Sequence, residues 1–400
     1  MITLDTALTG INARRFTQIR QAIADRELNK ALNWQVKDFT LFSTNLRRCL
    51  PELSPGQHWM KYQNLLTYRS MLLQEHENCE AIDQALAHVE DSSSAGYTGP
   101  LPAIFTSFHF GSYRSIVGIL VHQRIDFVMV INEKLYQAEE QRIRETVARV
   151  QAALGTEVYF DILNAEDPRA AMKMSSYLMR NVSLAIFADG NTGVGGEYRK
   201  DNKMARINFL GQPIFVRRGA AVLSKITRKP IVPLFVFYPE SESLAPAVVF
   251  HDPITCVGKK KEAINIAIKK LYAILEGYVR KYPDQWQTWF YFHKFLDVDT
   301  IRSQTPASMD QAPAGADDEV RFNDEQYALF KMDANGFLFD RAAYKTYPIE
   351  PALFDHLIKI KKGEYQTVGI DQFVSLDLGQ SLLSMRILVH SATQKFAHHD

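Results

Sequence analysis

The sequence of 400 residues carries almost no net charge, few cysteines and no long apolar run. Its 46 basic and 45 acidic side chains leave a net charge of +1, which excludes a strongly basic nucleic-acid binder. Apolar stretches such as residues 231–237 are far shorter than the ~18 residues of a membrane helix. Cys49, Cys79 and Cys256 are widely separated, which argues against a disulfide framework and a zinc site. No secretory signal is expected either, because the first twenty residues contain arginines and no apolar run.

The composition that remains is that of an ordinary globular protein. With 46% hydrophobic and 23% charged residues, the disordered and collagen-like classes are excluded. The length suggests roughly two to three domains. Scattered cysteines favour a reducing compartment, so we expect a cytoplasmic protein without a nucleic-acid partner.

The chain divides into a helical start, an alternating middle and a separate tail. Apolar residues recur at helical spacing over 16–32 and 59–73, and Ser54 is placed to cap the helix that Pro55 begins. Residues 91–100 have the composition of a linker. Beyond them, apolar strands are predicted at residues 103–108, 127–131, 157–162, 183–188 and 231–238. Helices predicted at residues 112–122, 139–154, 170–180 and 219–226 separate these strands. This alternation predicts an α/β fold with a mostly parallel sheet and helices on both faces.

A long helix over residues 260–280 closes this core, and a second linker, rich in Pro, Ala and Gly, covers residues 303–318. In the tail, two apolar runs flank the turn Asp333-Ala334-Asn335-Gly336, whose Asn-Gly pair is a hairpin signal. We therefore predict a large domain over 1–300, comprising a helical part (1–95) and an α/β core (101–296). A linker over 301–319 and a small α+β domain over 320–400 follow.

His109 is the first candidate for chemistry. It follows a predicted strand and precedes a predicted helix, and ligands of open α/β sheets bind outside such strand ends. A neutral histidine there can act as a general base. Gly111 would let the backbone approach a substrate, and amides near it could face an anion. The alternative is a structural histidine that bonds to a backbone carbonyl.

The glycine-rich loop over residues 190–196 invites a nucleotide-binding interpretation. It lacks the G-x-G-x-x-G spacing and the Gly-Lys-Ser/Thr of a P-loop, which argues against that interpretation. We favour a flexible rim of a substrate site, in which Gly190 and Asn191 contact substrate and residues 197–204 form an insertion.

Four segments in order carry a resemblance to a known family. They are residues 45–54 (Asn-Leu-Arg-Arg-Cys-Leu-Pro-Glu-Leu-Ser), 109–114 (His-Phe-Gly-Ser-Tyr-Arg), 208–233 with Asn-Phe-Leu-Gly-Gln-Pro at its start, and 282–289 (Tyr-Pro-Asp-Gln-Trp-Gln-Thr-Trp). Together they resemble the bacterial late acyltransferases of lipid A biosynthesis, within the lysophospholipid-acyltransferase-like superfamily. The resemblance extends from about residue 40 to residue 296.

The resemblance implies transfer of an acyl group from an acyl-carrier-protein or coenzyme A thioester to a hydroxyl or amine acceptor. His109 would take the acceptor's proton, and backbone amides near Gly111 with a nearby arginine would face the oxyanion. Ser112 and Tyr113 would contact substrate. The acyl carrier protein, through its phosphopantetheine, or coenzyme A is a co-substrate, and neither a bound cofactor nor a metal is expected. At most a peripheral contact with the inner membrane is implied.

The sequence departs from the family at Arg114. The family places an acid five residues after the histidine, where it orients the ring, and an arginine cannot accept that hydrogen bond. Asp189, after the strand at 183–188, should lie on the same sheet edge as His109, and we predict that it replaces the missing acid. Its alternative role is to cap the glycine-rich loop. Arg114 remains a candidate catalytic residue.

Arginines flank the segment at residues 208–213. Arg206, Arg217 and Arg218 are suited to the phosphates of the donor or to an anionic acceptor, with surface solvation as the alternative.

Two differences indicate an acceptor other than lipid A itself. Members of the family usually begin with a membrane-anchoring helix, of which this sequence shows no sign, and the tail domain is foreign to them. A soluble or biosynthetic acceptor is therefore expected. The alternative is a catalytically altered protein that acts as a binding or scaffold partner in a biosynthetic pathway, which Arg114 favours. A thioester hydrolase is a third possibility, but the G-x-S-x-G nucleophile elbow is missing from the sequence.

Overall fold

The computed structural model describes residues 4–32, 37–75, 97–190, 192–193, 196–197, 204–239, 246–304, 320–364 and 376–390. By their contacts, the residues form two compact units. Unit 1 comprises Met1–Glu27 and Asn45–Leu296, and unit 2 comprises Leu28–Thr44 and Asp297–Asp400. The division differs from the predicted boundaries because Leu28–Thr44 belongs with the tail. Most of the predicted linkers (91–100 and 303–318) and of the predicted insertion (197–204) lies outside the described residues.

A six-stranded sheet forms the centre of unit 1. Its strands are β1 (Ile104–Ser107), β2 (Phe127–Ile131), β3 (Phe160–Asn164), β4 (Ser183–Phe187), β9 (Ile231–Phe237) and β10 (Ala247–Phe250). They lie in the order β10-β9-β1-β4-β2-β3, and β10 alone is antiparallel to its neighbour. The central strands β1 and β9 are buried throughout, as continuous apolar runs predict.

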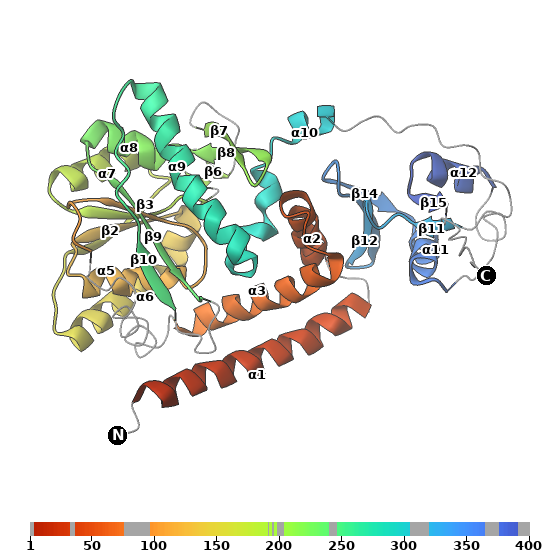
Figure 1. Ribbon diagram of the computed structural model, residues 1–400, viewed down its shortest axis with the longest axis horizontal. Helices are drawn as coiled ribbons and strands as arrows, with labels where there is room; N and C mark the ends of the chain where they lie inside the picture. Colours follow the sequence, from red (N-terminus) through yellow and green to blue (C-terminus); the bar gives the residue numbers. More distant parts are fainter. Residues whose placement is uncertain are drawn as a thin grey trace, which may run out of the picture. The chain divides into compact units, whose positions relative to one another are not determined.

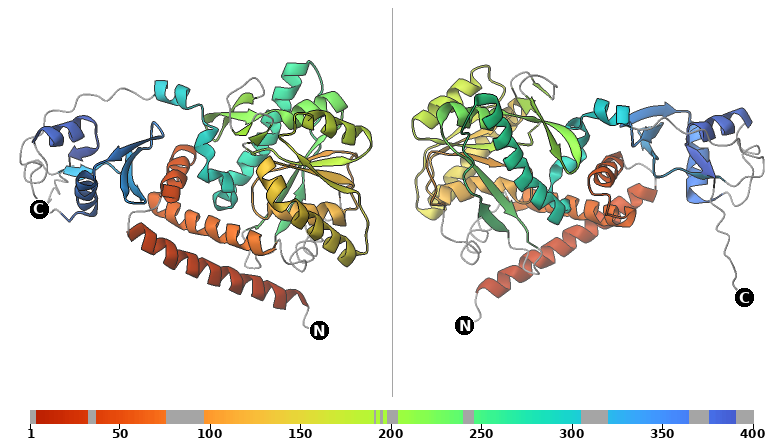
Figure 2. Two further views of the ribbon diagram at one scale, coloured as in Figure 1. Left: turned by 180° about the vertical axis from the view of Figure 1, so that it is seen from behind. Right: turned by 45° about the horizontal axis from the view of Figure 1, so that its top comes forward.

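Helices cover both faces of this sheet (Figure 1). One face carries α5 (Ile116–His122) and α6 (Glu133–Leu154), and the other carries α7 (Ala170–Met179), α8 (Gly219–Thr227) and α9 (Lys260–Lys281). The two further views in Figure 2 show the same layers. The prediction of a mostly parallel α/β sheet flanked by helices is thereby confirmed.

Two N-terminal helices also belong to unit 1. They are α1 (Leu4–Leu32), as far as Glu27, and α3 (Pro55–Glu75), and the rings of Phe16 and Tyr68 lie 5.3 Å apart between them. The start of α3 is capped as predicted. The amide of Gln57 donates to Ser54 Oγ at 3.4 Å, and the amide of Ser54 donates to the Gln57 side chain at 2.8 Å.

Short elements complete unit 1. A hairpin of β7 (Met204–Phe209) and β8 (Gln212–Arg217) turns at Leu210 and Gly211, which both have positive φ angles. The strands β5 (Thr192–Gly193) and β6 (Gly196–Glu197) pair in the glycine-rich loop. After α9, the aromatic segment forms the 3-10 turns η3 (Pro283–Gln285), η4 (Gln287–Phe290) and η5 (Phe292–Lys294).

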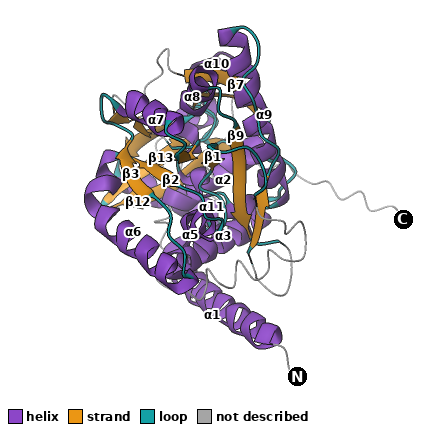
Figure 3. Cartoon of the chain, turned by 90° about the vertical axis from the view of Figure 1, so that its left-hand side faces the viewer, coloured by secondary structure: helices purple, strands orange, loops and turns teal. Residues whose placement is uncertain are grey.

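Unit 2 contains small antiparallel sheets and helices, those of the tail drawn in cyan to blue in Figure 1, and Figure 3 colours the helices and strands of the whole chain by type. Its sheets are β12 (Tyr327–Met332), β13 (Asn335–Asp340) and β14 (Lys345–Ile349), and β11 (Val320–Phe322) with β15 (Leu388–His390). Its helices are α10 (Val298–Gln304), α11 (Pro351–Lys362) and α12 (Leu376–Ser384), joined by the first part of α2 (Lys37–Cys49). From α2, Leu41 packs against Ala328, Phe330 and Phe339.

The tail hairpin forms, but its turn differs from the predicted one. Met332 pairs with Asn335, so the turn residues are Asp333, with φ 53°, and Ala334, while Asn335 and Gly336 lie in β13. Gly336 is required for packing, because a Cβ there would lie 2.6 Å from the Phe354 ring. Within the described ranges, no helix combines the length and hydropathy needed to cross a membrane.

Candidate active site

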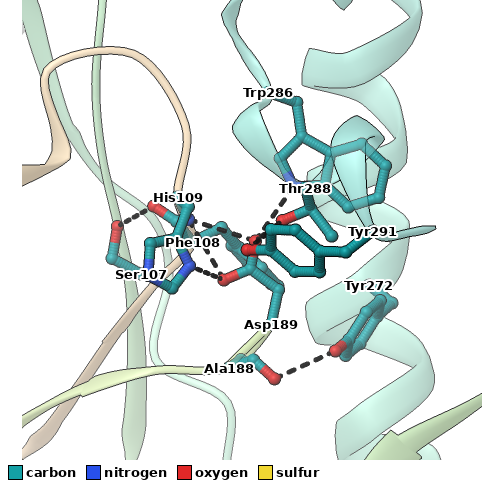
Figure 4. Close-up of polar contacts among 9 residues, drawn as sticks. All are labelled: Ser107, Phe108, His109, Ala188, Asp189, Tyr272, Trp286, Thr288 and Tyr291. Carbon is teal, nitrogen blue, oxygen red and sulfur yellow. Dashed lines mark hydrogen bonds and ion pairs between the residues drawn. The ribbon is translucent and has the colours of Figure 1, made fainter. Parts of the chain in front are cut away.

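The register of two neighbouring strands brings His109 and Asp189 together. Strands β1 and β4 run parallel, and Ser107 pairs with Phe187 at their carboxyl ends. His109 and Asp189 each follow their strand by two residues, so they leave the same sheet edge side by side. His109 Nδ1 lies 2.8 Å from Asp189 Oδ1 (Figure 4). The predicted proximity of Asp189 to His109 is therefore present in the structure.

Asp189 is buried among hydrogen-bond donors. Only 1% of the residue is exposed. Besides the His109 ring, the His109 backbone amide donates to both carboxylate oxygens at 3.1 Å. Oδ2 also accepts from Trp286 Nε1 at 2.9 Å and from the Thr288 hydroxyl at 2.6 Å. Figure 4 shows the carboxylate enclosed between His109 on one side and Trp286 and Thr288 on the other.

These donors keep the carboxylate ionised despite its burial. Burial by itself would raise the pKa of Asp189, but the positive charge available on His109 and the hydrogen bonds from His109, Thr288 and Trp286 outweigh it and lower the pKa below its ordinary value. An ionised Asp189 can only accept a hydrogen bond, so the proton of the contact lies on His109 Nδ1. This leaves Nε2 of a neutral His109 as the basic nitrogen.

The imidazole of His109 is held by its neighbours but remains accessible. Its ring meets the ring of Tyr113 edge-on at 4.9 Å and lies 5.2 Å from that of Phe187. The side chain is 26% exposed. Among the described residues, its ring hydrogen bonds go to Asp189 alone, so Nε2 can meet a substrate.

Gly111 has an internal steric role. Its φ angle is 55°, and a Cβ there would lie 2.3 Å from the carbonyl oxygen of Val236 in β9. Its close approach is therefore to the protein's own backbone, and not to a substrate as predicted. Ser112 is fully buried, and its hydroxyl lies 2.7 Å from that of Ser115.

The predicted oxyanion donors near Gly111 are already engaged. The amides of Phe110, Gly111 and Ser112 donate to the carbonyls of Phe108, Gln285 and Val236, at 2.7, 2.9 and 2.9 Å respectively. This expectation is therefore corrected, since an amide bonded to a protein carbonyl is not directed at a developing oxyanion. Gly190 is likewise engaged, because its amide donates to the carbonyl of Phe187 at 3.3 Å.

The aromatic segment after α9 braces the loop that carries His109. Gln287 N donates to the carbonyl of His109 at 2.9 Å, and Phe110 and Trp286 form an isolated antiparallel bridge. The side chain of Asn45 donates to the carbonyl of Trp289 at 2.6 Å. Three segments that are far apart in the sequence, at residues 45–54, 109–114 and 282–289, thus meet around one site.

The sequence did not indicate Trp286, Thr288 and Tyr291 as functional. Trp286 and Thr288 bind Asp189, and the Tyr291 hydroxyl lies 3.3 Å from that of Thr288. Trp286 and Thr288 lie in the segment at 282–289 that resembles the family, and Tyr291 lies two residues beyond it. The sequence could have indicated Trp286 and Thr288, because their side chains carry hydrogen-bond donors and a buried acid requires such donors.

The other predicted residues lie on other elements. Arg114 is half-buried in the 3-10 turn η2 (Tyr113–Ser115), at the start of α5. Arg206 and Arg217 belong to the β7–β8 hairpin, and Arg218 precedes α8. Asn191 lies outside the described residues.

A separate polar cavity of about 510 Å³ lies along the edge strand β3. Four of its charged groups form two ion pairs, Arg144 with Asp161 at 2.8 Å and Lys173 with Asp167 at 2.6 Å, while Arg180 lies over the Tyr177 ring at 4.9 Å. The Tyr177 hydroxyl donates to Asp161 at 2.5 Å, and hydrogen bonding with this acid raises the pKa of Tyr177. Asp161 is therefore the centre of a polar network that also contains Arg144 and Tyr177.

No protein-family model and no curated protein matches this sequence. The resemblance to lipid A acyltransferases therefore depends on the quoted segments alone.

Proposed function

We propose that the protein is an acyltransferase that moves an acyl group from an acyl-carrier-protein or coenzyme A thioester to a hydroxyl or amine. The observation that carries the proposal is the pair of His109 and buried Asp189. Asp189 fixes Nδ1 of the ring, and Nε2 is left without a partner among the described residues. This is the arrangement of a general base at the ligand-binding edge of a parallel sheet.

The reaction needs one proton carrier. His109 Nε2 takes the proton of the acceptor as the acceptor's oxygen or nitrogen forms a bond with the thioester carbonyl carbon. The tetrahedral intermediate then collapses, the carbon–sulfur bond breaks, and the thiolate takes the proton from His109. The products are the acylated acceptor and the free thiol, and the ionised Asp189 stabilises the imidazolium that exists between the two steps.

Direct transfer is favoured over a covalent acyl-enzyme. A serine or cysteine nucleophile would have to hydrogen-bond Nε2, and no described residue does so. Ser107 and Ser112 lie near His109 in sequence but are buried, and Ser112 contacts Ser115.

The oxyanion needs a donor other than the amides near Gly111. Arg114 lies in the 3-10 turn η2, between His109 and α5, and carries a permanent positive charge. We assign it to the charge that develops on the thioester oxygen or to an anionic group of the donor. In this scheme Arg114 has a role different from that of the acid found there in the family, because Asp189 already orients His109.

The acceptor in this proposal is a soluble or biosynthetic intermediate, and the donor is an acyl carrier protein or coenzyme A. Arg206, Arg217 and Arg218 are assigned to the phosphates of the donor or to an anionic acceptor. The order of the four resembling segments supports the assignment to this superfamily, and so do the contacts of residues 282–289 with both His109 and Asn45.

The test is release of free thiol by the purified full-length protein. Acyl-carrier-protein and coenzyme A thioesters of several chain lengths would be supplied with panels of hydroxyl and amine acceptors. We expect acceptor-dependent thiol release that falls at least 100-fold in His109→Ala. His251→Ala is the matched control, because His251 is also half-buried and its ring bonds the Tyr278 hydroxyl at 3.0 Å. Equal loss in both variants, or no release with any donor, would contradict the proposal.

A second candidate, a scaffold that binds thioesters without turnover, is favoured by Arg114 in the place of the acid. It predicts saturable binding of the acyl-carrier-protein thioester with no thiol release. Arg114→Glu distinguishes the two candidates. In an active enzyme it removes a useful positive charge and lowers the rate, whereas a scaffold that has lost its acid would gain activity.

A further inference from the structure

Asp189 receives different donors on its two oxygens. Oδ1 faces the imidazole of His109, whereas Oδ2 receives the indole N–H of Trp286 and the hydroxyl of Thr288. Both of these donors come from the segment after α9, nearly a hundred residues further along the chain. A carboxylate that is held at one oxygen cannot rotate about its final bond without breaking those hydrogen bonds. The contact of Oδ1 with Nδ1 is therefore kept in place by Trp286 and Thr288 at Oδ2, together with the His109 backbone amide, which donates to both oxygens at 3.1 Å.

The hydrogen atoms around Thr288 can be assigned by counting. A threonine hydroxyl has one proton, and at 2.6 Å from an ionised acid that proton points to Asp189. The Tyr291 hydroxyl lies on the acceptor side of Thr288 at 3.3 Å, so it competes with Asp189 for this one proton from the longer distance. Burial raises the pKa of Tyr291, so its hydroxyl stays neutral and is a weaker acceptor than the carboxylate. Thr288 and the His109 ring therefore donate to opposite oxygens of Asp189.

We propose that Thr288 and Trp286 are positioning residues that hold the carboxylate of Asp189 on His109. The inference rests on the proposed function for its catalytic consequence. We call the hydrogen bonds from Thr288 and Trp286 to Asp189 Oδ2 the clamp. The clamp is a property of the folded protein and can be measured without turnover. In the resembling family the acid lies five residues after the histidine, in the same segment. In this scheme Asp189 comes from another strand end, and the segment after α9 holds it against His109.

The first readout is the His109 ring itself. In protein labelled with ¹⁵N-histidine, the ring signals of His109 are identified by their absence in His109→Gln, since the chain has 11 histidines. We expect a downfield Nδ1 proton and the Nδ1–H tautomer in the unaltered protein and in Thr288→Ser, which keeps the hydroxyl. In Thr288→Val, which keeps the shape but removes the donor, we expect the downfield proton to shift upfield or disappear.

The second readout is kinetic. We expect Thr288→Val and Trp286→Phe to lower kcat by about 10- to 100-fold with KM within threefold, because each removes one hydrogen bond to a charged group. Thr288→Ser should stay within threefold of the unaltered protein, and Tyr291→Phe should show a smaller loss than Thr288→Val.

Trp289→Phe is the matched control. Trp289 is buried in the same segment, but its indole N–H donates to the carbonyl of Pro283 at 2.8 Å and not to Asp189. Both tryptophan variants remove an indole from the same core, so a general packing defect would affect them alike. We expect Trp289→Phe to keep the His109 signals and the kcat of the unaltered protein.

Two results would overturn the clamp. One is a Thr288→Val protein with unchanged Nδ1 proton and tautomer, and the other is an equal loss in Trp289→Phe and Trp286→Phe. If the unaltered protein transfers no acyl group, the proposed function fails, while the ¹⁵N experiment still decides the inference about Thr288 and Trp286.

Discussion

At the scale of the residue, the central feature is the acid that pairs with His109. Asp189 reaches Nδ1 of His109 from the neighbouring strand end at 2.8 Å. Nδ1 requires only an ionised acceptor at hydrogen-bond distance, whichever segment of the chain supplies it. Asp189 is almost fully enclosed, so its charge depends on its donors.

This burial predicts a pH-dependent contribution of Asp189 to stability. Its folded-state pKa lies below the unfolded value of about 3.9. The ionised carboxylate therefore stabilises the fold fully above that value, and the contribution is lost as the pH falls through the folded-state pKa. We expect Asp189→Asn to lower the free energy of unfolding by about 2 kcal/mol or more at pH 7, and the difference to shrink below about pH 4.

Urea unfolding followed by tryptophan fluorescence measures this difference, since Trp59, Trp286 and Trp289 all belong to unit 1. Asp355→Asn controls for the loss of a charge, because that side chain is 65% exposed. A penalty for Asp189→Asn that is the same at pH 3 and pH 7 would show that its ionisation does not stabilise the fold.

At the scale of the element, the sequence predicted most of the α/β core, because the spacing of apolar residues along the sequence agrees there with which residues are buried. Strand β2 and the start of α7 fall where the apolar pattern predicted them. The β7–β8 hairpin was not predicted as strands, because its turn uses Leu210 at a φ of 51°, which few non-glycine residues adopt. The tail turn lies within the predicted segment, but it is formed by Asp333, with a positive φ, and Ala334, whereas Asn335 and Gly336 belong to β13.

The same comparison explains which parts of the site were predictable. His109 and Asp189 follow strands, and the positions of strand ends can be predicted from apolar runs. Whether β1 and β4 are neighbours depends on the strand order of the whole sheet, which no local pattern contains. Trp286 and Thr288 reach Asp189 through tertiary contacts of a segment with no regular period, so their role could be found only in the structure.

The loop between β1 and α5 gives a prediction at this scale. Gly111→Ala would place a Cβ 2.3 Å from the Val236 carbonyl oxygen at a φ that favours glycine, and β9 cannot move without disturbing the sheet. We expect a loss of about 3 kcal/mol or more, from the strained backbone and the steric clash together. Gly211→Ala is the matched control, with a φ of 73° but no atom within 4 Å, and should cost about 1 kcal/mol.

Urea midpoints of the two variants test this expectation. Equal midpoints would mean that positive φ alone explains Gly111, and that the contact with β9 adds nothing.

At the scale of the whole molecule, the chain is divided by contacts and not by sequence order. The helix α2 contributes Lys37–Thr44 to unit 2 and Asn45–Cys49 to unit 1. Leu41 joins the small core of the tail sheet, and Asn45 bonds the carbonyl of Trp289. The apolar pattern of a helix shows which face is buried but not which partner buries it, so the sequence placed all of this region with the larger domain.

Arg341 provides the test of this division. Its guanidinium donates to the Thr44 hydroxyl at 2.7 Å and to the carbonyl of Thr40 at 3.4 Å, so it ties the start of α2 to the tail sheet within unit 2. We expect Arg341→Ala to lower the free energy of local opening at residues 40–44 by about 1–3 kcal/mol, measured by amide hydrogen exchange. Lys345→Ala, an exposed cation in β14, should leave this protection unchanged.

Under the proposed function, the acyl-transfer rate of Arg341→Ala should stay within twofold of the unaltered protein, because the contacts of His109 and Asp189 come from residues of unit 1. Distant sites without shared partners contribute independently to the free energy. Unchanged exchange at residues 40–44 would show that the hydrogen bonds of Arg341 do not stabilise this segment. A rate that falls together with the exchange protection would instead show that the start of α2 supports the His109 site, and the assignment of Leu28–Thr44 to a separate unit would then lose its functional meaning.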